Sequence, residues 1–483
     1  MLIRISVALL ALLALAAGAA TAAPAASGKG AKPPSKKASG DIFPFKVEQR
    51  SLDNGFRVVV IPYDSPGTVA YYTLVRTGSR DEIEPGHSGF AHFFEHMMFR
   101  GTDKYPQDRY TQVLKGMGAD SNAFTTDDFT LYHIVGPARE LETMMDMESD
   151  RFKNLKYGEE GFRTEALAVL GEYNKDASSP FLPLEEKLRD LAFTKHTYKH
   201  TTIGFIADVK AMPGYYDFSR QFFARFYRPE NCVLLVVGDA APQNVFALAA
   251  RYYGDWQKGY QPSPITPEPP QTEQKKAHLD WPSPGHPFLF EGYHIPAFST
   301  AGVDAAALQV IGQLLLAESS PLYQELVVDK QWVDFVQGGA DLHRDPYLFT
   351  VIARTKSEEL IPKVQEAVDH AIAELQGKPV DPERLARITS HLRYGFALGL
   401  NTPGQVAGQV AQFLAWSGGI DSINQSFAAI DKVTPADIQR LAREIFQPQN
   451  QTIVTLSHPA GKDGKQEKPA GAAGSQGGGE SHD

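Results

Sequence analysis

The chain has 483 residues, of which 42% are hydrophobic and 22% are charged, so it is long enough for two or more globular domains. Its formal net charge of −10 argues against nucleic-acid binding. The single cysteine, Cys232, excludes an intrachain disulfide, and its place in an apolar run indicates a buried strand residue rather than a nucleophile.

The start of the chain predicts export. Residues 1–23 carry a positive charge at Arg4, a Leu/Ala-rich core and small residues at possible cleavage points, which is typical of a secretory signal peptide. An uncleaved membrane anchor is the alternative, although the apolar core is short for a membrane span. Residues 24–41 are rich in Pro, Ala, Gly, Ser and Lys and predict a flexible linker, and residues 460–483 predict a disordered tail. We therefore expect a periplasmic or secreted protein.

The folded body opens with two predicted strands. Asp53-Asn54-Gly55 is typical of a hairpin turn, and the run that follows it, 56–61, is rich in valine. A second apolar run at 69–76 has the same character. Both are expected to lie in one sheet.

The segment 89–101 carries the most informative pattern in the chain. It reads GFAHFFEHMMFRG, and its apolar residues cover nearly every side of a helix, which predicts burial. His92 and His96 are one helical turn apart, and Glu95 shares their face. Two imidazoles and a carboxylate in the order H-x-x-E-H are the inverzincin signature. The pattern predicts a Zn²⁺ site that still needs a third protein ligand, and two surface histidines on an amphipathic helix are the alternative.

Hydrophobic periodicity and turn residues predict the other elements of the first half. They are a helix at 110–117, paired strands at 122–126 and 129–134, helices at 137–154, 159–176, 184–193 and 214–227, and a buried strand at 231–239. The mixture of strands and helices indicates an α/β fold.

The second half of the chain repeats the first faintly. A Pro-x-Asn triplet precedes an apolar strand twice, and its asparagines, Asn231 and Asn450, are 219 residues apart. The same shift takes 69–78 onto 288–297, another predicted strand. Similarity at a fixed spacing indicates two copies of one domain.

Only the first copy has the metal-binding pattern. The positions of the two histidines and the glutamate map onto Ile311, Leu314 and Leu315, so the second copy keeps the helix without the site. A stretch rich in Pro, Thr and Glu separates the copies. The expected boundaries are a zinc-binding peptidase domain at 42–260, a linker at 261–276 and a homologous non-catalytic domain at 277–459.

These features resemble the pitrilysin/insulinase family of zinc peptidases, and the chain is similar to bacterial members that are like the mitochondrial processing peptidase. The matching motif residues are Gly89, Ala91, His92, Glu95, His96, Phe99, Gly101 and Thr102. The resemblance covers nearly the whole body, with specific motifs in the first half and weak ones in the second. It implies an α/β (α+β) fold of two homologous domains, each a mostly antiparallel sheet packed against helices, forming half of a clam-like chamber.

The resemblance also implies the rest of the site. Glu172 lies at the family's spacing for the third zinc ligand, and Glu165 lies two turns earlier on the same helix, where it would orient the site. Asn122 and Ala123 match the edge strand on which a peptide substrate lies. The alternatives are solvated helix glutamates and an ordinary turn asparagine.

The expected function is a zinc metalloendopeptidase with one Zn²⁺ per chain. The metal activates a water molecule, and Glu95 serves as general base. Family members of one chain carry an arginine and a tyrosine in the second half, but Val327 and Asp334 take those positions here. We therefore expect a homologous partner chain that supplies the pair, with a self-dimer as runner-up. A non-catalytic assembly subunit with a vestigial metal site is the alternative function.

Overall fold

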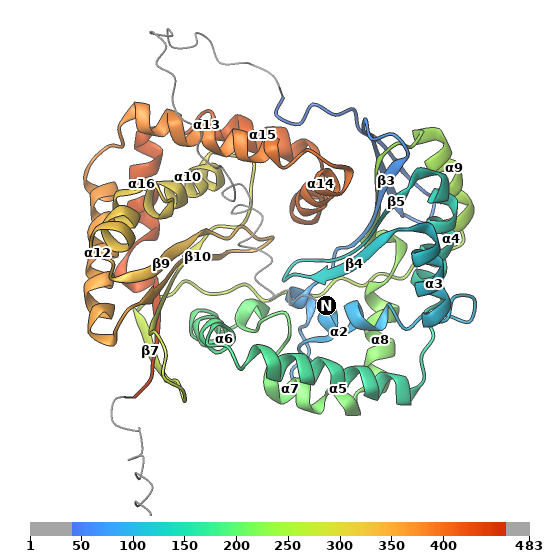
Figure 1. Ribbon diagram of the computed structural model, residues 1–483, viewed down its shortest axis with the longest axis horizontal. Coiled ribbons are helices and arrows are strands. Elements are labelled where there is room, and N and C mark those ends of the chain that lie inside the picture. The colour runs from blue at the N-terminus through green and yellow to red at the C-terminus, as the bar shows by residue number, and fades with distance from the viewer. Residues whose placement is uncertain (1–40, 460–483) are drawn as a thin grey trace, which may run out of the picture.

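The protein is built around two β-sheets. The computed structural model describes residues 41–459, so the predicted signal peptide, nearly all of the predicted linker after it and the predicted tail lie outside the described residues. The first sheet has the strand order β1-β2-β6-β3-β5-β4, and the second has the order β7-β11-β8-β10-β9. Each half is a mostly antiparallel sheet packed against helices (Figure 1), which confirms the α/β class and the two-domain arrangement.

The first half begins with a short edge strand and ends with a helix before the linker. Its strands are β1 (Glu48–Ser51), β2 (Arg57–Pro62), β3 (Thr68–Val75), β4 (Asp120–Thr125), β5 (Thr130–Pro137) and β6 (Cys232–Gly238). Its helices are α2 (Phe90–Met97), α3 (Gln107–Met117), α4 (Leu141–Asn154), α5 (Glu159–Asp176), α6 (Phe181–Ala192), α7 (Ile206–Ala211), α8 (Tyr216–Phe226) and α9 (Pro242–Tyr253). The sequence patterns did not predict α7 or α9.

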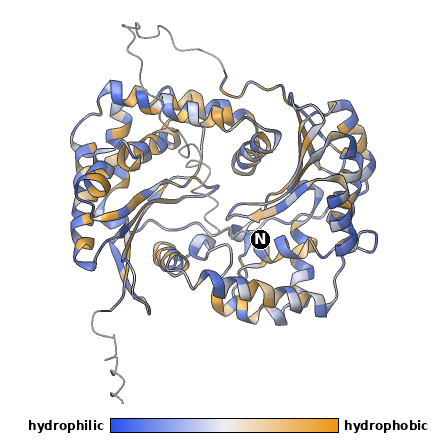
Figure 2. Ribbon diagram, in the orientation of Figure 1, coloured by the Kyte–Doolittle hydropathy of each residue, from blue (hydrophilic) through white to orange (hydrophobic). Residues whose placement is uncertain are grey.

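The second half has the same arrangement without a counterpart of β1. Its strands are β7 (Lys275–Asp280), β8 (Phe288–Ile295), β9 (Val333–Ala340), β10 (Tyr347–Thr355) and β11 (Gln451–Ser457). Its helices are α10 (Asp304–Leu316), α11 (Pro321–Tyr323), α12 (Ile361–Gly377), α13 (Pro382–Leu398), α14 (Pro403–Ser417), α15 (Asp421–Ile430) and α16 (Pro435–Ile445). Figure 2 shows hydrophilic and hydrophobic residues alternating along the outer helices, as expected for helices with one buried face.

Strand β7 starts inside the predicted linker. Its residues alternate between exposed and half-buried side chains, and within residues 41–459 it pairs only with β11, at the edge of the second sheet. An edge strand with so little apolar content has no strong sequence signature. The strand therefore extends the second half to Lys275, two residues before the predicted boundary at 277.

Strand pairing refines the internal repeat by one residue. Val236 of β6 pairs with Tyr71, whereas Thr455, the residue 219 positions later, pairs with Leu289. The shift between β3 and β8 is therefore 218 rather than 219. The difference matters because a slip of one residue moves every side chain to the other face of a sheet.

The two halves exchange one helix each. Helix α6 of the first half packs on the second sheet, where Leu184 and Leu188 share a buried cluster with Phe288 and Phe290. Helix α14 of the second half packs on the first sheet, with the Tyr72 hydroxyl donating to its backbone at 3.1 Å. In Figure 1, α14 lies beside β3 and α6 lies below β9. Each sheet is thus covered in part by a helix from the other half.

No helix within residues 41–459 is long and apolar enough to cross a membrane.

Candidate metal centre

Helix α2 is fixed at its first turn by a buried carboxylate. Its N-cap residue, Gly89, has a φ of 92°, and a Cβ there would lie 2.5 Å from the carbonyl oxygen of Ile203. The carboxylate of Glu82 accepts hydrogen bonds from the backbone N–H groups of Gly89 at 2.7 Å and Ala91 at 2.6 Å. The two carboxyl oxygens satisfy free N–H groups at this end of the helix, while burial raises the pKa of Glu82 well above its usual value. These contacts therefore fix the first turn of α2, just before His92.

The apolar face of α2 anchors the helix between the first sheet and α8. Phe93, Phe94 and Met97 are fully buried, and the Phe94 ring stacks on Phe222 with centroids 5.3 Å apart. The hydroxyl of Tyr132, on β5, donates to the Phe94 carbonyl at 3.1 Å. This packing leaves the two histidines and Glu95 half-buried on the remaining face of the helix.

His92, His96 and Glu172 come together across α2 and α5. Each offers one ligand atom, and these atoms lie within 4.8 Å of one another. The Nε2 atoms of His92 and His96 lie 3.7 and 3.2 Å from Oε2 of Glu172. Two imidazole nitrogens and one carboxylate oxygen are a donor set that suits catalytic zinc, and they leave a fourth position open. The three residues therefore fit a Zn²⁺ ion.

The charges of the cluster depend strongly on one another. Burial lowers the pKa of His92. Burial would also lower the pKa of His96, but hydrogen bonds to Glu165 and Glu172 outweigh it and raise the pKa to about 10. The hydrogen bond from His96 holds the pKa of Glu172 down, at about 2. A metal ion competes with the proton on His96, so metal binding releases it.

Glu165 connects the cluster to an arginine. One of its oxygens lies 3.0 Å from Nδ1 of His96, and the other accepts from Nε of Arg100 at 2.5 Å. The Nη2 atom of Arg100 contacts the same oxygen. Arg100 thereby fixes Glu165, and Glu165 fixes the ring of His96 with Nε2 turned to Glu172.

Glu95 borders a cavity next to the ligands. The cavity has a volume of about 370 Å³ and is lined by Glu95, His96, Phe99, Arg100, Gln107 and Glu165. Oε2 of Glu95 accepts a hydrogen bond of 2.8 Å from Oγ1 of Thr125, the last residue of β4. A carboxylate beside a metal-ligand set and an open cavity can move a proton at that point.

Asn122 and Ala123 lie in the middle of β4. This strand ends the first sheet, and within the described residues it pairs only with β5. Asn122 is exposed and Ala123 is buried. The outer edge of β4 therefore offers backbone groups to which an extended peptide could pair.

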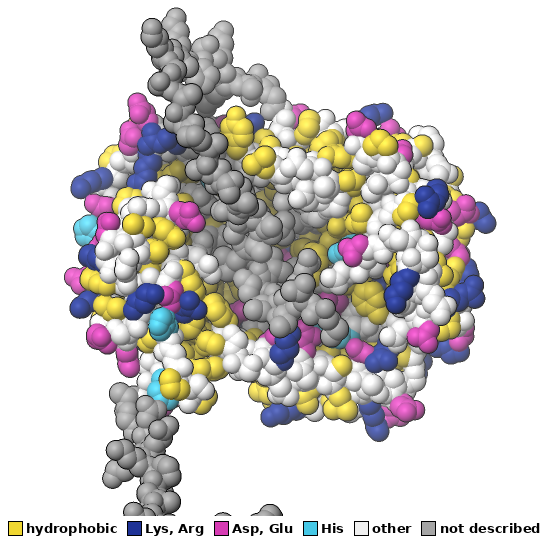
Figure 3. All heavy atoms as spheres, viewed as in Figure 1, with side chains coloured by type: hydrophobic (Ala, Val, Ile, Leu, Met, Phe, Trp, Pro, Cys, Tyr) yellow, Lys and Arg dark blue, Asp and Glu magenta, His cyan; other side chains and the backbone are white. Residues whose placement is uncertain are grey.

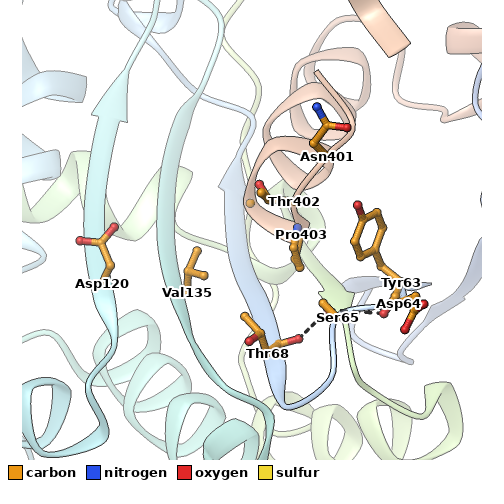
Figure 4. A pocket seen from close by; sticks show the side chains of 10 residues that line it. Tyr63, Asp64, Ser65, Thr68, Asp120, Val135, Asn401, Thr402 and Pro403 are labelled. Carbon is orange, nitrogen blue, oxygen red and sulfur yellow. Dashed lines mark hydrogen bonds between the residues drawn. The ribbon is translucent and has the colours of Figure 1, made fainter. Parts of the chain in front are cut away.

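A second cavity lies at the start of the same strand. Its volume is about 580 Å³, and it opens between the turn that joins β2 to β3 and the beginning of α14. Figure 4 shows Asp120 of β4 on one side and Asn401, Thr402 and Pro403 on the other. None of its lining residues belongs to the metal-ligand cluster.

The two residues expected from the sequence in place of an arginine and a tyrosine have structural roles. Val327 is half-buried in a helical turn, Gln324–Asp329, and packs against the core. Asp334 forms ion pairs with Arg354 at 2.7 Å and with Lys356, and one of its oxygens lies 2.6 Å from Nδ1 of His286. Neither side chain can donate a hydrogen bond to a developing oxyanion.

Sequence reasoning missed three residues that shape the site. Glu82 and Thr125 lie on segments with no motif of their own, and only their contacts reveal them. Arg100 is inside the 89–101 segment, but its role depends on Glu165, which is distant in sequence.

Comparisons with known proteins cover both halves. Residues 58–204 match the family described as insulinase (peptidase family M16), and residues 216–392 match the peptidase M16 inactive domain. The chain belongs to the M16, or insulinase, peptidase family. As an M16 protein it is 27% identical over 426 residues to the zinc protease PqqE of Helicobacter pylori, covering 85% of this chain and 93% of that one.

Other relatives have different names or show the fold alone. Mitochondrial cytochrome b-c1 complex subunit 1 of Caenorhabditis elegans is 25% identical over 414 residues, covering 83% of this chain and 86% of that one. The crystal structure of a protease from Helicobacter pylori aligns with a TM-score of 0.80 at 27% identity, covering 86% of this chain and 99% of that one. A peptidase M16 inactive domain from Pseudomonas fluorescens aligns with a TM-score of 0.76 at 16% identity, covering 86% and 98%. This M16 chain thus has relatives named as zinc proteases and relatives that are not.

Proposed function

We propose that this chain is a zinc-dependent metalloendopeptidase that hydrolyses short or unfolded peptides within an enclosed chamber. The observation that carries the proposal is the meeting of His92, His96 and Glu172 at one point, beside the carboxylate of Glu95. Relatives named as zinc proteases support the same function.

The residues of the site have distinct roles in peptide hydrolysis. His92, His96 and Glu172 would hold the zinc, which when bound polarises the scissile carbonyl and lowers the pKa of water. Glu95 takes the proton of the attacking water and passes it to the leaving amine. Glu165 keeps His96 oriented.

The substrate would bind as an added strand. A peptide laid along the outer edge of β4, at Asn122 and Ala123, pairs its backbone with that strand. Because β4 ends at Thr125, beside Glu95, the peptide runs past the base. Figure 3 shows acidic and basic side chains interspersed over this face of both halves, so the visible surface gives no support to a preference for basic peptides.

Glu95→Gln tests this function. The variant should keep its zinc, because Glu95 is not among the three clustered ligands, and lose about 100- to 10,000-fold in peptide cleavage. Zinc is measured by atomic absorption and cleavage with a fluorogenic peptide library. Unchanged cleavage would sink the assignment of Glu95 as base. The library digestion also gives the residue preference at the cut.

We also propose that a homologous chain completes the active site. The second half offers Val327 and Asp334 where the family has donors, and the loss of an oxyanion donor costs about 100- to 1,000-fold in rate. The partner should be exported, should lack H-x-x-E-H and should carry the arginine–tyrosine pair. A self-dimer is the runner-up, but it would contain two zinc sites and no such pair.

Comparing turnover of the chain alone and with a candidate partner tests this proposal. We expect the partner to raise turnover by about 100-fold or more on one peptide. Full activity of the lone chain, unaffected by the partner, would refute the heterodimer.

A non-catalytic assembly subunit is the second candidate. The similarity to a cytochrome b-c1 subunit favours it. Stoichiometric zinc in the purified chain would speak against it, and a folded chain without zinc at neutral pH would favour it.

We further propose that the chain is exported. The signal-like segment 1–23 supports this, and one relative of known structure is titled a periplasmic protease, PqqL of Escherichia coli. Fractionation of cells that express the tagged chain would test it, and a cytoplasmic pool alone would contradict it.

A further inference from the structure

We propose that Thr125 is a positioning residue that orients the carboxylate of Glu95 for proton transfer, and that the second half of the chain holds Thr125 in place. The inference rests on the proposed peptidase function, because it assigns roles around the same base. It also gives the second half a task that does not depend on an arginine–tyrosine pair.

The contact between Thr125 and Glu95 selects one of two equivalent oxygens. Oγ1 of Thr125 donates to Oε2 of Glu95 at 2.8 Å. A glutamate carboxylate otherwise turns freely about its last torsion, so a fixed donor on one oxygen leaves the other in a defined direction. A base held in this way needs no reorientation before it takes a proton.

Thr125 also joins the base to the strand proposed to bind substrate. It is the last residue of β4 and pairs with Thr130 of β5. The next residue, Thr126, closes the turn, because its N–H donates to the Phe129 carbonyl at 2.8 Å. Strand β4 would therefore position both the bound peptide and the carboxylate of Glu95.

The turn after Thr125 is held by buried contacts from outside the first sheet. Asp127 accepts from Arg189 at 2.5 Å, and its other oxygen lies 3.2 Å from Nε2 of His343. Asp128, which is fully buried, accepts from the backbone N–H of Arg344 at 2.9 Å. His343 and Arg344 lie in the loop between β9 and β10 of the second half. The second half therefore helps to fix the end of β4, together with Arg189 and Tyr198 of the first half.

Removal of the hydroxyl tests the role of Thr125. Thr125→Val should lower kcat by about tenfold or more, because a hydrogen bond to a charged group is lost, and should leave KM within about twofold. The affinity of Thr125→Val for zinc, measured by chelator competition from the metal-free protein, should equal that of the wild type. Thr125→Ser should restore kcat. Thr73→Val is the matched control, because it removes a buried strand hydroxyl that has no hydrogen-bond partner among the described residues.

The outcomes that would overturn the proposal are specific. A wild-type kcat in Thr125→Val, or a loss that follows zinc release or is shared by Thr73→Val, would overturn the role of Thr125. A wild-type kcat in His343→Ala, which removes a side-chain contact of the second half with Asp127, would overturn the role of the second half if folding and zinc binding are intact.

Unfolding measurements, which do not depend on peptidase activity, test this inference separately from the proposed function. Denaturant midpoints of the metal-free chain are compared for Thr125→Val, Glu95→Gln and the double variant. Shifts that do not add support the contact, and additive shifts overturn it. If the wild-type chain cleaves no peptide, the proposed function fails, and the midpoints still decide whether Thr125 holds Glu95.

Discussion

Glu165 holds one carboxylate oxygen 3.0 Å from Nδ1 of His96. With Nδ1 as the donor to Glu165, the proton that metal binding releases is the one on Nε2, the atom that lies 3.2 Å from Glu172. The tautomer that a metal ligand requires is therefore imposed by a residue two helical turns away from Glu172 on α5. Glu165 is in turn charged and fixed because Arg100 binds its second oxygen.

Glu165→Gln should weaken zinc binding by about 10- to 100-fold, because a neutral amide holds neither His96 nor Arg100 as firmly. Competition with a chromophoric chelator measures the affinity. Glu160→Gln, an exposed change on the same helix, is the control and should bind zinc as the wild type does. Equal affinity of all three proteins would show that Glu165 does not orient the ligand.

Gly89→Ala should destabilise the protein and reduce zinc binding. The residue needs a φ of 92°, and the new Cβ would lie 2.5 Å from a backbone oxygen, so the start of α2 must shift. Gly116→Ala is the contrasting change. Nothing lies within 4 Å of its Cβ, and alanine favours a helix by up to about 1 kcal/mol. Urea unfolding should move in opposite directions for the two variants.

Asp127→Ala should cost about 3–5 kcal/mol in the free energy of unfolding, because it removes the buried carboxylate of the two that pair with the guanidinium of Arg189. Asp103→Asn breaks a pair with Lys156 in which both side chains are largely exposed, and it should cost less than about 1 kcal/mol. Similar urea midpoints for the two variants would contradict the importance of the buried pair.

The buried carboxyl group of Glu291 should make stability depend on pH. Burial raises its pKa to about 7, and the nearby charge of Asp369 adds to the effect. The folded protein therefore holds this proton more tightly than the unfolded chain does. The stabilisation is complete below the unfolded pKa of about 4.5 and is lost as pH rises through 7, on the order of 3 kcal/mol.

Glu291→Gln should remove this part of the pH dependence and raise stability at pH 8. Unfolding free energies at pH 5 and pH 8 measure it. Glu366→Gln, on the exposed face of α12, controls for the loss of one negative charge. If the pH 5 to pH 8 difference is the same in both variants, Glu291 is not its source.

Patterns within one segment were enough to predict most elements of the first half. The strands at 56–61 and 69–76 and the helix at 159–176 lie within one residue of β2, β3 and α5, because each has a strong apolar or periodic signature. Strand β7 was missed because an edge strand with alternating polar residues looks like a linker. Short helix α7 had no signal of its own.

The proposed zinc ligands were easier to predict from the sequence than the residues that hold the site in place. His92, Glu95 and His96 share one helix, so spacing alone places them on one face. Glu172 needed a family resemblance, and the structure then brings it to the histidines. Glu82 and Thr125 act through tertiary contacts, which no local pattern encodes.

Because the two halves exchange α6 and α14, neither half should be stable without the other. A protease that nicks the stretch between Gln261 and Gln274, where no helix or strand lies, should leave both fragments bound to each other in gel filtration. Either fragment expressed alone would expose the apolar surface that the other half's helix normally covers, and should aggregate. Co-expressed fragments should assemble, so an inherited split of the gene into two would be tolerated at this point.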